Sequence, residues 1–304
     1  MSRRPIATVL ALLAGSVIVA AGQQPVFRSG VAMVRVDVLA TDRGKPIRDL
    51  ESADFDLRDN GVPQKVAAVF AETEALDVYL VLDASGSVKG PPLEHLQEAA
   101  LALLDALRAP DRAQLTLFHH RVLVPARLDT DRQAVRSAIQ RIEATGYTSL
   151  LDALYLTMTT IEATANRSMA LVFSDGLDNR SWLSSGRILD VARQTETVTY
   201  AVAFRPPHVY RPSGVIDRLA DPDEDLLRSL AEQSGGKLIW AEESKELKAA
   251  FLSLLAEMRA RYLLTYYPTG VAKPGWHTLD VRLRNRSGKV VARSGYMQRP
   301  AAVR

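Results

Sequence analysis

Short apolar runs that alternate with helical stripes, from Asp77 to about Arg261, constrain the fold of this chain most strongly. Two of the runs, residues 78–82 and 169–173, are almost continuously apolar, which is typical of parallel strands covered on both faces. Four more strands are predicted at residues 114–118, 122–126, 198–204 and 237–240. Strands and helices that alternate in this way predict an α/β fold built on a doubly wound, mainly parallel sheet.

Helices are expected between these strands because apolar residues recur there with helical spacing. One stripe comprises Leu93, Leu96, Ala100, Leu103, Leu104 and Leu107, and another comprises Leu247, Phe251, Leu254, Leu255 and Met258. The second stripe predicts a last helix at about residues 243–261. The proline-bearing stretch at 205–221 is expected to be a loop insertion.

Both ends of the chain have β character. Val34, Val36 and Val38 alternate with charged residues, and Asp59-Asn60-Gly61 is a strong hairpin signal. Near the other end, strands are expected at 261–267 and 279–283, with residues 289–293 pairing back onto the latter. Neither stretch is long enough for a good core of its own. We therefore predict an α/β domain at 75–261, inserted between β segments at 23–74 and 262–304 that pack together as one small β domain.

The first 22 residues resemble a signal peptide. Arg3 and Arg4 precede an uncharged apolar run, and small residues lead to a cleavage point near Gln23. An uncleaved anchor is the alternative, although the run is short for a membrane span. Cleavage predicts an extracytoplasmic protein (periplasmic, cell-surface or secreted) with no membrane span.

Composition excludes several function classes. The chain has no cysteine, which excludes disulfides and thiolate chemistry. Cleavage would leave 36 basic against 35 acidic residues in place of 38 against 35, so the net charge falls from +3 to +1. No basic cluster interleaved with aromatic residues occurs, so nucleic-acid binding is not expected.

Oxygen-bearing side chains follow two of the predicted strands. Asp83, Ser85 and Ser87 come directly after the run 78–82, and Asp175 follows the run 169–173. Ligands of doubly wound sheets bind beyond the carboxyl ends of such strands, and Thr148 lies on a loop that can reach this edge. Hydroxyl and carboxylate oxygens suit a small hard cation such as Mg²⁺, with Mn²⁺ and Ca²⁺ as alternatives.

The sequences Asp83-Ala84-Ser85-Gly86-Ser87 and Ser174-Asp175-Gly176, with Thr148 between them, resemble the metal-ion-dependent adhesion site of von Willebrand factor A domains. The resemblance covers residues 77–260 and implies a Rossmann-like fold. Short motifs in the flanks, such as Tyr266-Tyr267-Pro268, are similar to a bacterial group of secreted von Willebrand A-related proteins.

The resemblance also implies roles for individual residues. Ser85, Ser87 and Thr148 would bind the cation through their hydroxyls, and Asp83 and Asp175 would act directly or through water. An acidic side chain of a protein or peptide partner would complete the coordination. The implied function is cation-dependent protein binding or adhesion without enzymatic activity, and the family often links binding to movement of the last helix.

Two alternative functions are also consistent with the sequence. A Mg²⁺-dependent phosphohydrolase of the haloacid dehalogenase type also has an aspartate at the position of Asp83, but it needs a second one where this chain has Ser85. A metal-independent envelope assembly protein is a further alternative. Several polar residues nearby are expected to have structural or surface roles rather than to bind metal: Asp152, Asp178, Asn179, His119 and His120.

Overall fold

The computed structural model describes residues 33–71, 74–175, 178–204, 222–271 and 273–298. The predicted leader at 1–22 and the predicted loop insertion at 205–221 lie outside these ranges. Within them, no helix has both the length and the apolar character needed to cross a membrane.

A six-stranded sheet forms the centre of the larger part of the molecule, with the strand order β11-β10-β9-β6-β7-β8. Its strands are β6 (Leu76–Asp83), β7 (Arg112–Phe118), β8 (Val122–Asp129), β9 (Arg167–Ser174), β10 (Val198–Phe204) and β11 (Leu238–Ala241). Neighbouring strands are parallel except β8, which runs antiparallel to β7. The sheet confirms the predicted fold class and all six predicted strands.

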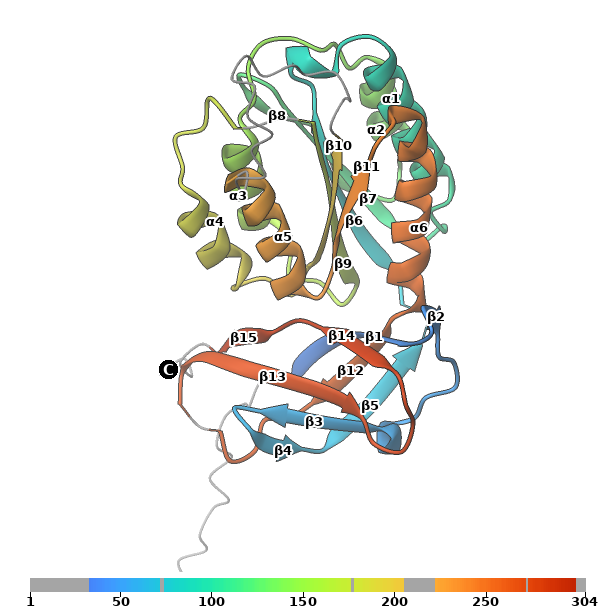
Figure 1. The fold of residues 1–304 in the computed structure, drawn as a ribbon, viewed down its shortest axis with the longest axis vertical. Helices are drawn as coiled ribbons and strands as arrows, with labels where there is room; N and C mark the ends of the chain where they lie inside the picture. The colour runs from blue at the N-terminus through green and yellow to red at the C-terminus, as the bar shows by residue number, and fades with distance from the viewer. Residues whose placement is uncertain (1–32, 72–73, 176–177, 205–221, 272, 299–304) are drawn as a thin grey trace, which may run out of the picture. The chain divides into compact units, whose positions relative to one another are not determined.

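Helices cover both faces of this sheet (Figure 1). On one face lie α1 (Pro91–Asp105), α2 (Gln133–Gln140) and α6 (Leu247–Ala260), and on the other α3 (Leu150–Thr160), α4 (Ser185–Ala192) and α5 (Pro222–Ser234). Side chains of β6 alternate between the two cores: Leu80 packs under α1 and α6, whereas Tyr79 and Val81 pack on the α3 side. We call β6–β11 with these helices the α/β module.

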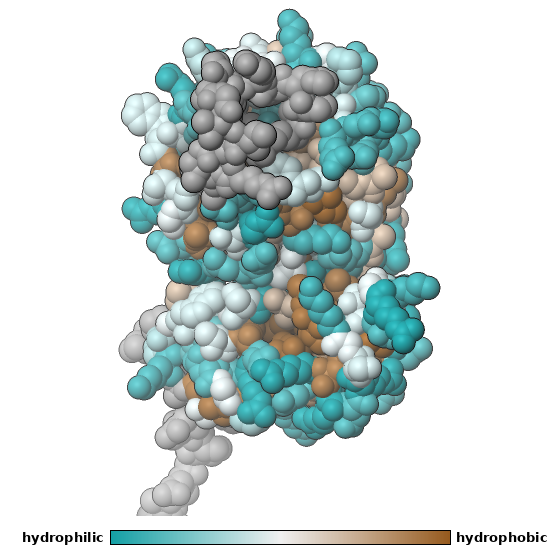
Figure 2. All heavy atoms as spheres, viewed as in Figure 1, coloured by the Kyte–Doolittle hydropathy of each residue, from teal (hydrophilic) through white to brown (hydrophobic). Residues whose placement is uncertain are grey.

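The strands from the two ends of the chain form two further sheets, which we call the β module. One has the order β14 (Lys289–Ala292), β1 (Val34–Asp42), β12 (Tyr262–Tyr266) and β5 (Val66–Ala71), with β2 (Lys45–Pro46) beside β1. The other has the order β15 (Gly295–Gln298), β13 (Gly275–Leu283), β3 (Phe55–Asp59) and β4 (Val62–Gln64). Both contribute to one apolar core, and hydrophobic residues also reach the surface over these strands (Figure 2).

Turn chemistry explains the hairpin between β3 and β4. Asn60 and Gly61 adopt φ angles of 48° and 80°, the left-handed region that a two-residue hairpin turn requires. The predicted hairpin is therefore confirmed.

The expected pairing of residues 289–293 with residues 279–283 is wrong. β14 instead pairs with β1, and β13 lies between β3 and β15. Pairing with β1 covers an edge that would otherwise be open, and it packs Val290 and Ala292 against the shared core.

Buried arginines join the two modules. Arg167 at the start of β9 pairs with Asp37 of β1, with an Nε–Oδ1 distance of 2.6 Å, and donates to the Met258 carbonyl. Arg261, between α6 and β12, donates to the Tyr200 hydroxyl at 2.8 Å. Because α6 leads directly into β12, no linker separates the modules at this point.

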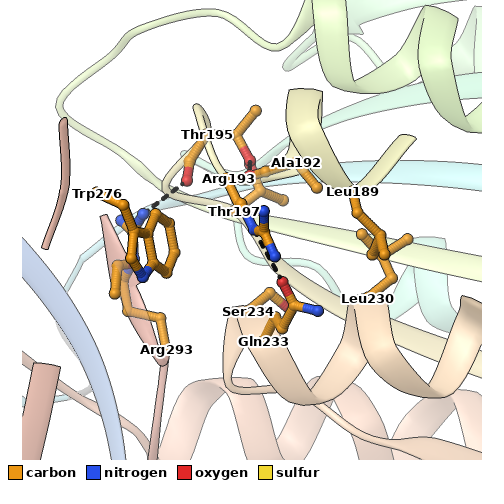
Figure 3. A pocket seen from close by; sticks show the side chains of 11 residues that line it. Leu189, Ala192, Arg193, Thr195, Thr197, Leu230, Gln233, Ser234, Trp276 and Arg293 are labelled. Atoms are coloured by element: carbon orange, nitrogen blue, oxygen red, sulfur yellow. Dashed lines mark hydrogen bonds between the residues drawn. The ribbon is translucent and has the colours of Figure 1, made fainter. Parts of the chain in front are cut away.

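A cavity of about 20 Å³ lies at the amino end of β10 (Figure 3). It is lined by Leu189, Ala192, Arg193, Thr195, Thr197, Leu230, Gln233, Ser234, Trp276, Arg293 and Gly295. Ligand pockets usually measure hundreds of Å³, so this cavity has room for little more than water. It also lies at the opposite end of β10 from the carboxyl edge of the sheet.

Asp59 is the polar centre of the β module. Its carboxylate is fully buried, lies 2.7 Å from His277 Nδ1, and accepts hydrogen bonds of 2.8 Å from the hydroxyls of Tyr266 and Tyr296. Strands β3, β12, β13 and β15 therefore meet at one side chain.

We predict that Asp59→Ala lowers the free energy of unfolding by about 3–5 kcal/mol, because it leaves three buried polar groups without their acceptor. Urea unfolding followed by circular dichroism measures the change. Asp280→Asn, at an exposed carboxylate of β13, is the control and should change stability little. A loss below about 1 kcal/mol for Asp59→Ala would contradict the role of this network.

Candidate metal centre

The carboxyl ends of β6 and β9, which are neighbours in the sheet, bring the first predicted site residues together. Asp83 ends β6 and is completely buried. One of its oxygens accepts a hydrogen bond from the Ser85 backbone N–H at 2.8 Å, and the other accepts from the Ser174 hydroxyl at 3.0 Å. These contacts hold the carboxylate at the start of the loop that contains both serines.

A chain of hydrogen bonds then joins the serines to the second carboxylate. The hydroxyls of Ser85 and Ser87 lie 2.9 Å apart, and the Ser87 hydroxyl donates to Asp175 Oδ1 at 2.8 Å. The other oxygen of Asp175, Oδ2, is buried and has no hydrogen-bond partner among the described residues. Burying an acceptor without a partner costs free energy. A positive or hydrogen-donating group beside Asp175 Oδ2 would therefore stabilise the site.

Thr148 reaches the same edge on its own loop. The Gly86 N–H donates to the Gly146 carbonyl at 3.0 Å, which places this loop against the serine loop. Thr148 itself is buried and exchanges two hydrogen bonds with Asn179: its N–H donates to Asn179 Oδ1 and its carbonyl accepts the Asn179 N–H. Asp83, Ser85, Ser87 and Asp175 are thus joined through side-chain and backbone contacts, and Thr148 through the backbone of its loop.

Gly146 makes this approach possible. Its φ of +72° lies in the left-handed region, and a Cβ atom at this position would collide with the ring of His120. His120 packs against the loop and stacks on His119, with 4.3 Å between the ring centroids.

No group of three or more His, Cys, Asp or Glu side chains within the described ranges could hold a metal ion.

Neighbouring carboxylates hold the surrounding loops. Asp178 Oδ2 accepts the Leu151 N–H at 2.9 Å near the start of α3, and Asp152 accepts the backbone N–H groups of Trp182 and Leu183 at 3.2 Å. These contacts agree with the structural roles that the sequence favours for both aspartates.

Burial of two acids in one site changes their protonation. Loss of water raises the pKa of Asp83 to about 7, and the negative charge of Asp175 adds to this effect. Burial also raises the pKa of Asp175. A cation bound between these carboxylates would favour their ionised forms, so the electrostatics and the orphaned oxygen both fit a metal ion.

Sequence reasoning assigned no role to Ser174 and expected Asn179 to be only a loop residue. Ser174 contacts Asp83, and Asn179 holds the Thr148 loop. The contact of Ser174 could have been predicted, because Ser174 ends a strand that lies beside β6. The contact of Asn179 could not, because it depends on how two loops that are distant in the sequence meet.

Comparison with known proteins identifies the domain type of the central part of the chain. Residues 78–177 match the family model of the von Willebrand factor type A domain. The chain contains a von Willebrand factor type A domain. The matched residues cover most of β6 and all of β7, β8 and β9 in the α/β module.

Solved structures share the fold of the type A domain at low identity. A von Willebrand factor type A protein from Catenulispora acidiphila is 14% identical with a TM-score of 0.50, covering 86% of this chain and 75% of that one. Proximal thread matrix protein 1 from the mussel byssus, with a zinc-occupied MIDAS motif, is 12% identical with a TM-score of 0.50, covering 64% and 48%.

An uncharacterized protein from Synechocystis is similar in sequence, with 26% identity over 241 residues. The match covers 72% of this chain and 53% of that protein. The chain therefore spans about half the length of this curated relative.

We predict that Asp83→Asn stabilises the protein in EDTA at pH 8, by about 3 °C in Tm or more. The pKa of Asp83 is about 7 in the folded protein against 3.8 ordinarily, so its contribution favours folding at low pH and is lost as the pH rises toward 7. Thermal unfolding between pH 5 and pH 8 measures this difference.

Asparagine keeps an acceptor for the Ser85 N–H and removes the charge, so the Tm of the variant should fall less between pH 5 and pH 8. Asp280→Asn, which removes an exposed carboxylate, is the matched control. An identical pH dependence in wild type and Asp83→Asn would contradict the raised pKa.

Proposed function

We propose that this chain is a protein-binding module that holds an acidic side chain of its partner through a divalent cation. The observation that carries the proposal is the buried, unpartnered Oδ2 of Asp175 at the end of the hydrogen-bonded chain from Ser85 through Ser87. A cation at this point would satisfy the orphaned oxygen and relieve the charge repulsion between Asp175 and Asp83.

The donor set suits a small hard cation. Ser85, Ser87 and Thr148 would bind through neutral hydroxyls, and Asp83 and Asp175 would bind directly or through water. Oxygen donors of this kind favour Mg²⁺, with Mn²⁺ or Ca²⁺ as alternatives. The zinc-occupied motif of the mussel protein supports a divalent ion in this fold.

The charge balance supports a binding role. Two carboxylates among five donors leave the bound ion electrophilic, so the ion would supply an attraction for a carboxylate from a protein or peptide partner. Ser85 occupies the position where a phosphohydrolase of the haloacid dehalogenase type would need a second carboxylate, and a serine hydroxyl is a poor general acid or base near neutral pH. We therefore propose that the chain is not an enzyme.

We further propose that the protein works outside the cytoplasm, because residues 1–22 have the pattern of a signal peptide. The pairing of β1 with β12 supports the proposed division into segments 23–74 and 262–304 around an inserted domain at 75–261.

We predict that Asp83→Ala abolishes Mg²⁺ binding measured by isothermal titration calorimetry, and that Ser87→Ala weakens it at least tenfold. Asp83 fixes the serine loop through the Ser85 N–H, and Ser87 links that loop to Asp175. Circular dichroism should show that both variants keep the fold.

Asp280→Asn lies on the β module and should bind Mg²⁺ like the wild type. Unchanged Mg²⁺ affinity in a folded Asp83→Ala variant would refute the proposed site. Binding of a native partner that persists in excess EDTA would instead favour the metal-independent assembly role.

A further inference from the structure

Two aromatic side chains on the loops near the candidate metal centre are strongly exposed to solvent. Trp182 is 93% exposed and Tyr147 is 64% exposed, which makes them the most exposed large hydrophobic residues in the described part of the chain. Tyr147 directly precedes Thr148, and Trp182 follows the loop of Asp178 and Asn179. Both therefore belong to the loops that build the edge of the site.

The backbone of each aromatic residue is held in place although its ring is free. The Trp182 N–H donates to the Asp152 carboxylate at 3.2 Å, and the preceding hydroxyl of Ser181 accepts the Asp152 N–H at 3.0 Å. The paired hydrogen bonds between Thr148 and Asn179 tie the two loops together. Rings presented from a fixed backbone lose little conformational entropy when a partner covers them.

Two exposed basic residues lie close in sequence to the proposed site. These are Lys89, two residues after Ser87, and Arg180, two residues before Trp182, and no ion pair of either is found within the described ranges. The carboxylates of Asp152 and Asp178 accept backbone hydrogen bonds, and the loop of Tyr147 exposes one acid, Glu143, together with one base, Arg141. An acidic partner would therefore meet a complementary field before it reached the cation.

We propose that Tyr147 and Trp182 form an aromatic rim that selects partner proteins in which the metal-binding Asp or Glu stands next to an apolar residue. This inference rests on the proposed function, since the cation would hold the carboxylate and the rim would cover the neighbouring side chain. Exposed Trp and Tyr side chains at the centre of an interface contribute much of its binding energy when a partner removes them from water.

The test uses the full chain and immobilised eight-residue peptides with a central aspartate flanked by glycine, leucine, phenylalanine or lysine, with asparagine peptides as blanks. Binding is measured in Mg²⁺ and in EDTA by biolayer interferometry. We expect wild type to bind the leucine- and phenylalanine-flanked peptides at least tenfold more tightly than the glycine-flanked one, only in Mg²⁺.

Trp182→Ser and Tyr147→Ser should each reduce this preference at least threefold without changing the Mg²⁺ affinity measured by calorimetry. Tyr267→Ser removes a 56% exposed aromatic residue from the β module and is the matched control, expected to change neither quantity.

The outcomes separate this inference from the proposed function. Failure of the wild type to bind Mg²⁺ refutes both. If the wild type binds Mg²⁺, three results would overturn the aromatic rim alone. The wild type could show no preference for apolar flanks, it could bind no aspartate peptide, or the Trp182→Ser variant could keep the preference. An exposed tryptophan could instead bind a membrane, and vesicles containing phosphatidylserine test this. If Trp182→Ser loses vesicle binding but keeps peptide binding, the aromatic rim is also overturned.

Discussion

Asp83 ends the central strand of the larger sheet where water does not reach, and Asp175 stands at the end of the neighbouring strand. Two acids buried this close oppose each other's ionisation, and the serines between them supply hydrogen bonds but no positive charge. The surrounding loops hold this arrangement through contacts from Asn179 and Asp178. The fold thus maintains an electrostatically unfavourable cluster that a cation would neutralise.

The α/β architecture follows from local sequence properties. The runs of β6 and β9 are apolar on both faces because helices cover both, so these two strands could be predicted from the chain alone. The strand that pairs with β14 could not be predicted in this way, because alternation of apolar and polar residues identifies a strand but not the strand beside it. In the same way, the spacing of Asp83, Ser85 and Ser87 indicated a site, whereas the contact of Asn179 with Thr148 depends on tertiary structure.

The proposed donors include three hydroxyls, which explains why a sequence pattern identifies the candidate site more readily than a count of acidic side chains does. A cluster of carboxylates or imidazoles is visible from composition, but a centre with three hydroxyls and two acids looks like ordinary turn residues until the loops are brought together. The approach of Gly86 to Gly146 does this, and it depends on a glycine at position 146. The loops that carry Tyr147 and Trp182 are tied together by the hydrogen bonds between Thr148 and Asn179.

The pairing of Ala71 with Tyr262 has a consequence for biosynthesis. The chain leaves the β module and returns to it at adjacent positions, so the α/β module can fold as soon as it is made. Strand β1, by contrast, pairs with β12 and β14, which lie near the other end of the chain and are synthesised much later. During that interval its edges are open to other polypeptides, and an exported chain would depend on chaperones to protect them until translation is finished.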